Sequence, residues 1–278
     1  MATDAAAGPR HAVAGDLELL FLGTGTSAGV PMIGCDCATC TSNDPRDNRT
    51  RCSVVISYAS PAGGATSVLV DTAPELRVQA IANNLRRVDA LVFTHAHADH
   101  LMGLDDVRRF NSIRGGPLDV WADEATHAVL SKVFTYAFRE PDPDSALYRP
   151  HLVPRVIDGP FEIGGRAWSP ILLIHGDMPV LGYRVGPLAY CTDVSEIPPA
   201  SLELLRGLDV LVLDALQFRK HPTHFTIEEA LAVVAELRPR RTYFTHMSHG
   251  VMHARDEVNL PDGVHFAYDG LRVTAAGG

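Results

Sequence analysis

The segment Asp89–His100 reads DALVFTHAHADH. Its first half, DALVFT, is apolar and predicts a buried strand over residues 89–94. Its second half places three histidines and one carboxylate within six residues, directly after that strand. Imidazole and carboxylate are the ligands that hold Zn²⁺ and similar divalent cations. The segment therefore predicts a metal site at the end of a strand.

The spacing within this segment indicates two adjacent cations rather than one. Alternation along an extended backbone places His95 and His97 on the same side. A helical turn after them would direct Asp99 and His100 toward a second point nearby. These ligand types accept Zn, Mn or Fe, so the sequence does not choose the metal.

Three further metal-competent side chains follow apolar runs elsewhere in the chain. His175 follows ILLI, Asp193 follows LAYCT, and His246 follows TYFT. Ligands typically converge where strands end in α/β folds. We therefore expect these three residues to complete the two coordination shells.

Strand-like and helix-like patterns alternate along the rest of the chain and predict a layered α/β sandwich. Residues 53–58 and 67–71 are expected to form a hairpin, and residues 140–154 a loop. Thr226 is expected to cap the helix that follows it. The predicted strands are 17–22, 53–58, 67–71, 89–94, 167–174, 181–185, 188–191, 209–213, 241–245, 264–268 and 271–274, and the predicted helices are 74–85, 123–138 and 227–237.

Composition limits the classes of function. The chain has 278 residues, 46% hydrophobic and 21% charged, with a formal net charge of −9. This is the composition of a globular protein, and the acidic balance argues against strong binding to nucleic acid or to anionic membranes. No apolar run is long enough to span a membrane and no secretory signal is visible, so a cytoplasmic location is expected. Residues 1–16 resemble a loose tail, and residues 17–278 are expected to form one domain.

Together these residues resemble the motif set of the metallo-β-lactamase superfamily, from about residue 17 to the C-terminus. The resemblance implies a four-layer αββα sandwich with a two-metal site at one edge. One metal would take His95, His97 and His175, the other would take Asp99, His100 and His246, and Asp193 would bridge them. Asp71, in LVDTA, would orient a ligand histidine by a hydrogen bond.

Both ends of the chain show a closer resemblance to the PhnP-like phosphodiesterases, in GTGTSAGVPMIGCDCATC (residues 23–40) and THMSH (residues 245–249). It implies a structural zinc on Cys35, Cys37, Cys40 and His249. Three thiolates and one imidazole make a closed tetrahedral shell. Three of the five cysteines lie within six residues, a spacing that favours metal thiolates over disulfides.

The expected activity is hydrolysis of a small cyclic or nucleotide-like phosphodiester by a hydroxide shared between two metals. Asp99 is counted among the catalytic residues. His224, which precedes a predicted helix, is the candidate proton donor to the leaving oxygen, and His221 is its rival. Arg46, Arg49 and Arg51 are left between an anion-binding and a structural role.

Other functions remain open at this stage. The fold also suits an RNA nuclease resembling tRNase Z, and an ester, lactone or thioester hydrolase, because fold does not fix substrate. Relatives of quinone-cofactor biosynthesis (PqqB) share the Gly-rich, cysteine-bearing N-terminus, which suggests a non-hydrolytic accessory protein. The sequence does not decide whether the chain forms a homodimer.

Overall fold

The computed structural model describes residues 17–61, 63–139 and 148–276. The predicted N-terminal tail, residues 1–16, lies outside the described residues. So does part of the loop predicted at residues 140–154.

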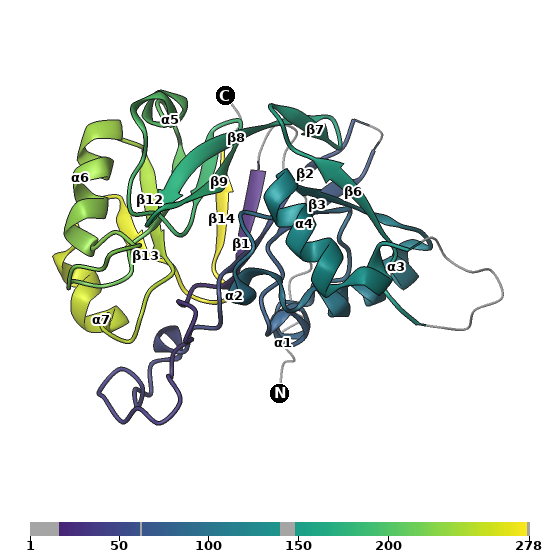
Figure 1. The fold of residues 1–278 in the computed structure, drawn as a ribbon. Helices are drawn as coiled ribbons and strands as arrows, with labels where there is room; N and C mark the ends of the chain where they lie inside the picture. The colour runs from purple at the N-terminus through teal and green to yellow at the C-terminus, as the bar shows by residue number, and fades with distance from the viewer. Residues whose placement is uncertain (1–16, 62, 140–147, 277–278) are drawn as a thin grey trace, which may run out of the picture.

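Two seven-stranded sheets form the centre of the molecule (Figure 1). The first has the order β14-β1-β2-β3-β4-β5-β6 and the second β13-β12-β11-β10-β9-β8-β7. The strands of the first sheet are β1 (Leu17–Gly23), β2 (Ser53–Ala59), β3 (Ala65–Val70), β4 (Ala90–Val92), β5 (Leu118–Ala122), β6 (Leu152–Val156) and β14 (Arg272–Ala275). Those of the second are β7 (Phe161–Ile163), β8 (Arg166–His175), β9 (Met178–Val185), β10 (Leu188–Cys191), β11 (Val210–Asp214), β12 (Arg241–Thr245) and β13 (Val264–Phe266).

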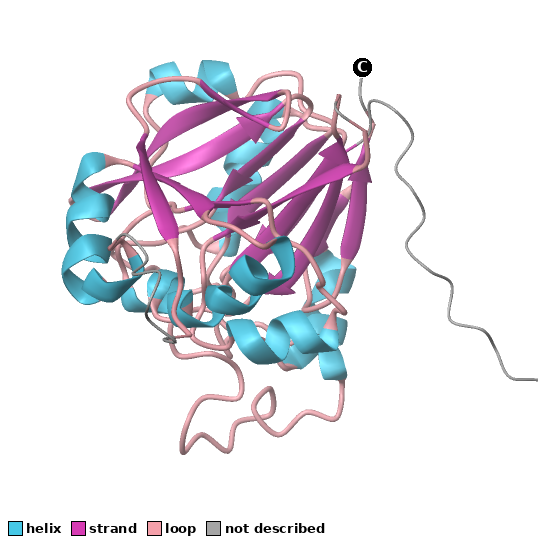
Figure 2. Ribbon diagram, turned by 90° about the vertical axis from the view of Figure 1, so that its right-hand side faces the viewer, coloured by secondary structure: helices cyan, strands magenta, loops and turns pink. Residues whose placement is uncertain are grey.

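Helices cover the outer faces of both sheets (Figures 1 and 2). They are α1 (Leu76–Ala82), α2 (Ala98–Leu101), α3 (Arg108–Arg114), α4 (Glu124–Val133), α5 (Pro199–Leu204), α6 (Ile227–Leu237) and α7 (His253–Asp256). The arrangement confirms the predicted four-layer αββα sandwich. None of the helices among the described residues is long and apolar enough to cross a membrane.

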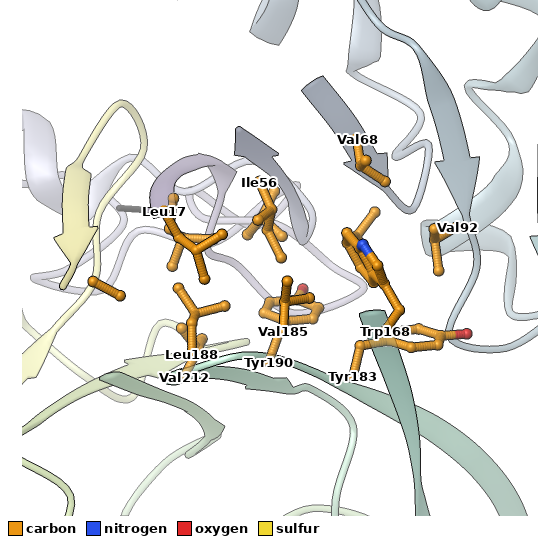
Figure 3. Close-up of a cluster of buried hydrophobic side chains, with 14 of the residues drawn as sticks. Leu17, Ile56, Val68, Val92, Trp168, Tyr183, Val185, Leu188, Tyr190 and Val212 are labelled. Atoms are coloured by element: carbon orange, nitrogen blue, oxygen red, sulfur yellow. The ribbon is translucent and has the colours of Figure 1, made fainter. Parts of the chain in front are cut away.

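Three apolar clusters fill the three interfaces between the four layers. The middle cluster lies between the sheets and includes Trp168, Tyr183 and Tyr190 (Figure 3). The outer clusters pack each sheet against its helices. Strand β1 contributes to two of them: Leu17, Leu19 and Phe21 point into the middle cluster, and Leu20 and Leu22 point outward. This alternation follows from the two-residue repeat of a strand that is buried on both faces.

The strand directions bring the predicted ligands to one edge. Strands β10, β11 and β12 are parallel, so the residues after their carboxyl ends lie at the same edge of the second sheet. Strands β3 and β4 are parallel in the first sheet. The two segments that follow them, at Asp71 and at residues 94–100, are joined by a hydrogen bond between Thr72 N and His100 O.

Some elements differ from the sequence prediction. The prediction of a loop over residues 140–154 is wrong at its C-terminal end, because Leu152–Val156 forms β6 and pairs with β5 in parallel. The first predicted helix starts two residues later than expected, at Leu76, and ends at Ala82. The second begins as predicted after Asp123, whose carboxylate accepts the Thr126 N–H, but it ends at Val133. Helix α6 has its predicted bounds and a capping box formed by Thr226 and Glu229.

Candidate metal centre

The structure brings the seven predicted active-site ligands together at the edge of the sandwich. They fall into two groups. Within each group, every residue places one nitrogen or oxygen atom within 4.8 Å of those of the other members. The first group is His95, His97, His175 and Asp193, and the second is Asp99, His100 and His246.

In the first group, Asp193 Oδ2 lies 3.8 Å from His95 Nε2 and 3.9 Å from His175 Nε2. His95 is oriented through Nδ1, which is 2.9 Å from Thr94 Oγ1. His175 Nδ1 lies 2.7 Å from the carbonyl oxygen of Thr223. His97 is the exposed member of the group, and its ring centre is 4.5 Å from that of His95. The two fixed imidazoles therefore turn their Nε2 atoms toward Asp193.

In the second group, Asp99 Oδ2 lies 3.4 Å from His100 Nε2 and 3.7 Å from His246 Nε2. Asp193 approaches this group too, at 3.2 Å from His100 Nε2 through Oδ1 and at 3.4 Å from His246 Nε2 through Oδ2. Nitrogen and oxygen ligands of one tetrahedral zinc would be separated by about 3.4 Å. Asp193 thus stands between the two groups at ligand-to-ligand distances from both.

Three residues at strand ends have positive φ, which is uncommon for residues other than glycine. They are Asp71 after β3 (φ 62°), Asp193 after β10 (φ 57°) and His246 after β12 (φ 59°). Strained backbone of this kind concentrates at functional sites, where the surrounding structure holds it. Here it turns each side chain out of the strand direction at the edge where the groups meet.

Asp71 fixes the segment that carries four of the candidate ligands. Its Oδ1 accepts the Thr94 N–H at 2.9 Å, and its Oδ2 accepts the Thr94 hydroxyl at 2.8 Å. The same Oδ2 lies 2.7 Å from His100 Nδ1. A carboxylate in this position selects the tautomer that leaves His100 Nε2 free for a cation.

Buried atoms and charges at the site fit a cation. Among the described residues, the Nε2 atoms of His95, His100 and His246 are buried and have no hydrogen-bond partner. Burial lowers the pKa of His95 well below its usual value. Burial would also lower the pKa of His100, but the charges of Asp193 and Asp71 raise it well above its usual value. The carboxylates therefore favour positive charge at this position, which a bound divalent cation would supply.

His224 also reaches the site, together with an aspartate that the sequence interpretation missed. His224 Nδ1 lies 2.8 Å from Oδ2 of Asp214, a fully buried residue at the end of β11. The ring of His224 lies 4.6 Å from that of His175 and 4.6 Å from that of His246. Asp214 directly follows the predicted strand 209–213, and this place at a strand end is the signal that could have identified it. His221, the rival of His224, lies beside it with ring centres 5.2 Å apart.

The predicted cysteine group is also assembled. The Sγ atoms of Cys35, Cys37 and Cys40 lie 3.2, 3.5 and 3.5 Å from His249 Nδ1. Zinc–sulfur and zinc–nitrogen bonds of ordinary length at a tetrahedral angle separate the two ligand atoms by about 3.6 Å. All five cysteines are free thiols, so no disulfide competes with metal binding. Backbone donation from Cys40 lowers the pKa of Cys37 to about 6, which favours a thiolate at neutral pH.

The remaining predictions concern isolated residues. Cys52 and Cys191 are fully buried, as expected for small core residues. Arg46, Arg49 and Arg51 each pair with a carboxylate, on Asp44, Asp47 and Glu75 respectively. These pairings favour the structural role for the three arginines.

Comparison with known proteins defines the class to which this fold and site belong. The model of the β-lactamase superfamily domain matches residues 66–247, so the chain belongs to that family. Its four-layer sandwich is the metallo-β-lactamase fold. The solved structure of a diphosphatase from the PhnP family is 42% identical in sequence, with a TM-score of 0.85, and the match covers 93% of this chain and 97% of that one.

Two curated relatives carry other names. An octanoyltransferase of Porphyromonas gingivalis is 35% identical over 260 residues, which cover 92% of this chain and 51% of that protein. The chain therefore spans about half the length of this relative. Coenzyme PQQ synthesis protein B of Pseudomonas paraeruginosa is 26% identical over 240 residues, which cover 73% of this chain and 74% of that protein.

Proposed function

We propose that this chain is a binuclear metal-dependent hydrolase of small phosphodiesters. The observation that carries the proposal is the position of Asp193 between two groups of histidine and aspartate side chains. Among the described residues, the buried Nε2 atoms of His95, His100 and His246 in these groups have no hydrogen-bond partner. One cation would be held by His95, His97 and His175, the other by Asp99, His100 and His246, and Asp193 would contact both. Zinc, manganese or iron suits these ligands.

When bound, such a pair of cations supplies a hydroxide at neutral pH and neutralises charge that develops on the phosphoryl oxygens. The chain's own residues hold the geometry for this chemistry. Asp71 orients His100, and the carbonyl oxygen of Thr223 orients His175. Both contacts fix a ring so that its Nε2 atom faces the site.

His224 is proposed to protonate the leaving oxygen. Its Nδ1 is engaged by Asp214 Oδ2, so the proton available for transfer is the one on Nε2. The buried Asp214 carboxylate holds the ring in place, in the way that an aspartate orients a catalytic histidine in other hydrolases. As the bond between phosphorus and the leaving oxygen breaks, that oxygen would take the Nε2 proton.

The cysteine group is proposed to hold a third, structural zinc. Its three sulfur ligands and one nitrogen leave no open position for a substrate. It would join the N-terminal loop to His249, three residues after the candidate ligand His246.

A diphosphate is the second candidate substrate, because the PhnP-family relative at 42% identity is described as a diphosphatase. Cleavage of a diphosphate also breaks a bond from phosphorus to a bridging oxygen, so the same residue roles apply. The octanoyltransferase name is not carried over, since this chain matches about half of that protein. The net charge of −9 argues against an RNA nuclease.

The proposal is tested by loading purified protein with Zn²⁺ or Mn²⁺ and measuring hydrolysis of bis-p-nitrophenyl phosphate, a cyclic nucleotide and a dinucleoside diphosphate. We expect turnover of at least one substrate and its loss in His97→Ala. His265→Ala is the matched control, because His265 is an exposed histidine that pairs with Glu257 away from the site. Absence of turnover by the loaded protein, or equal turnover in His97→Ala, would contradict the proposal.

A further inference from the structure

The segment that follows His246 has little regular secondary structure. Residues from the N-terminal loop satisfy several of its backbone groups, and Leu216 O accepts the Ser248 N–H. Met247 exchanges hydrogen bonds with that loop, donating to Thr24 O and accepting from Thr26 N. Helix α7 begins only at His253. The geometry of His246 therefore depends on contacts made by a distant part of the chain.

Arg49 makes the central contacts to this segment. Its Nη1 donates to the carbonyl oxygens of Ser248 at 3.2 Å and Val251 at 2.8 Å. Its Nη2 donates to Asp47 Oδ1 at 3.1 Å. The two carbonyls lie on either side of His249, the imidazole of the cysteine group. One guanidinium thus holds the turn that joins the candidate active-site ligand to the candidate structural zinc.

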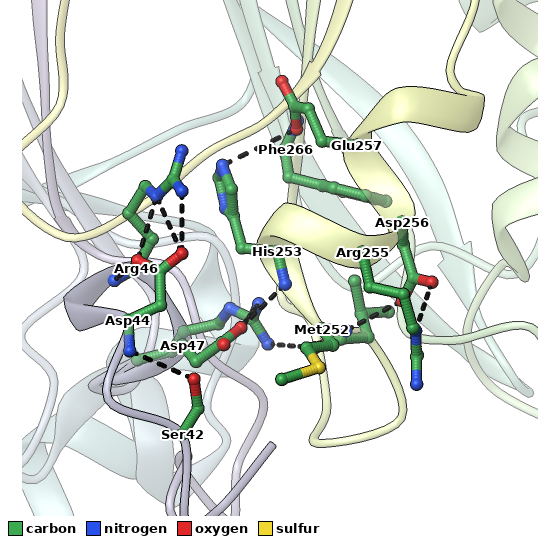
Figure 4. Close-up of polar contacts among 12 residues, drawn as sticks. Ser42, Asp44, Arg46, Asp47, Met252, His253, Arg255, Asp256, Glu257 and Phe266 are labelled. Atoms are coloured by element: carbon green, nitrogen blue, oxygen red, sulfur yellow. Dashed lines mark hydrogen bonds and ion pairs between the residues drawn. The ribbon is translucent and has the colours of Figure 1, made fainter. Parts of the chain in front are cut away.

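Asp47 completes the arrangement. Its Oδ1 also accepts the backbone N–H of His253 at 2.7 Å, at the start of α7 (Figure 4). Asp47 follows Asp44 and Arg46, which form their own ion pair with each other. The carboxylate therefore fixes both the guanidinium of Arg49 and the far end of the segment that Arg49 holds.

Burial makes this pair unusual. Arg49 has a relative exposure of 1% and is the only lysine or arginine among the described residues in the buried class. Its backbone is also fixed, since Arg49 and Val30 exchange both hydrogen bonds, at 2.7 and 2.8 Å. A buried cation is costly unless it is paired and hydrogen-bonded. An arginine at this position offers five N–H donors in a rigid fork, which a lysine does not offer.

We propose that Arg49, fixed by Asp47, is a positioning residue that sets the placement of His246 and hence the affinity of the second cation group. The inference rests on the proposed function, because it assigns His246 to that group. Arg49 does not touch the substrate. Its role is to keep the carbonyls of Ser248 and Val251 in place so that the backbone after β12 retains the positive φ of His246.

The test compares Arg49→Met, Arg49→Lys and Asp47→Asn with wild type by Co²⁺ titration of the metal-free full chain. Thiolate-to-cobalt absorption reports the cysteine group, and total cobalt bound reports all groups. For Arg49→Met we expect at least tenfold weaker binding of the cation assigned to Asp99, His100 and His246. The thiolate absorption should also fall, because the carbonyls that Arg49 holds flank His249, while the cation assigned to His95, His97 and His175 should bind as in wild type. Arg49→Lys should recover part of this loss, and Asp47→Asn should show a smaller loss. Arg46→Met is the matched control and should behave as wild type, since Arg46 is partly exposed and pairs with Asp44 rather than with the segment after His246.

Two results would overturn the inference: wild-type binding of all cations by Arg49→Met, or equal weakening of every site, which would indicate general destabilisation. A crystal structure of Arg49→Met provides a second readout that needs no cation. The inference requires the His246 ring to move by more than about 0.5 Å, the tolerance of a functional constellation. If wild type binds only the thiolate-held cobalt, the proposed function fails. The crystal structure of Arg49→Met then decides by itself whether Arg49 positions His246.

Discussion

His224 and Asp214 form a buried pair, with 2.8 Å between Nδ1 of the imidazole and Oδ2 of the carboxylate. The same oxygen accepts the backbone N–H of Val194 at 2.8 Å, next to Asp193. Asp214 therefore connects the candidate proton donor to the backbone of the residue that stands between the two cation groups. Because Asp214 lies at the end of β11, its carboxylate reaches both the His224 ring and the backbone N–H of Val194.

The pair predicts a specific loss of turnover. Removing the proton donor in His224→Gln should lower kcat by about 10²–10⁴-fold on a substrate with a poor leaving group, with KM little changed. The loss should be smaller on p-nitrophenyl esters, whose leaving oxygen needs no proton. His221→Gln is the control and should stay close to wild type. The opposite ranking of the two variants would assign proton donation to His221.

Asp71 should act through metal affinity rather than through contact with substrate. Asp71→Asn leaves the side chain nearly the same size but weakens the bonds to Thr94 and His100. Loss of such an orienting carboxylate costs about 10–100-fold in metal affinity. Competition with a chelator measures this directly. Unchanged affinity in a folded Asp71→Asn would show that Thr94 and the backbone alone orient His100.

Thiol chemistry separates the cysteine group from the other two cysteines. After metal is removed by a chelator, the partly exposed Cys35 and Cys37 should react with a thiol reagent at pH 8 while the chain stays folded. Cys40 should react more slowly, because burial raises its pKa to about 11. Cys191 should not react, because burial raises its pKa to about 12, and burial raises the pKa of Cys52 further. Mass spectrometry of the labelled chain should find Cys35 and Cys37 modified first, Cys40 later, and all five cysteines modified only after unfolding. Labelling of Cys191 in the folded protein would contradict the burial argument.

Substitution of Trp168 should destabilise the core between the sheets. This side chain is fully buried, and its Nε1–H donates to Tyr58 Oη at 3.1 Å. Trp168→Ala should lower the free energy of unfolding by about 3–5 kcal/mol, measured by denaturant titration. Phe218→Ala is the control, since Phe218 is 54% exposed, and should change stability by less than about 0.5 kcal/mol. Similar values for the two variants would mean that the sheets do not pack through Trp168.

Sequence reasoning predicted best where a local pattern carries the information. The amphipathic pattern of Ile227–Leu237 and its capping residue gave helix α6 its exact bounds. The histidine segment after β4 gave four candidate ligands at once. Strand ends gave the other three, because parallel strands bring their carboxyl ends to one edge whatever their separation along the chain.

Sequence reasoning failed where the structure depends on distant partners. Strand β6, with three exposed residues in succession, forms because it pairs with β5 and not because of its own pattern. Asp214 directly follows a predicted strand but belongs to no recognised motif, and its role depends on the ring of His224 ten residues away. Arg49 was left between anion binding and structure, because its partners are carbonyl oxygens about 200 residues later. Backbone acceptors of this kind leave no signature in side-chain identity.

The number of cations that the folded chain binds tests the central claim most directly. Native mass spectrometry of the full chain, purified in the presence of Zn²⁺, should show three cations per chain. His246→Ala should show two, and Cys37→Ser should lose the thiolate-held cation while keeping the other two. A wild-type chain that binds a single cation, lost in Cys37→Ser and kept in His246→Ala, would contradict the account of a two-cation active site.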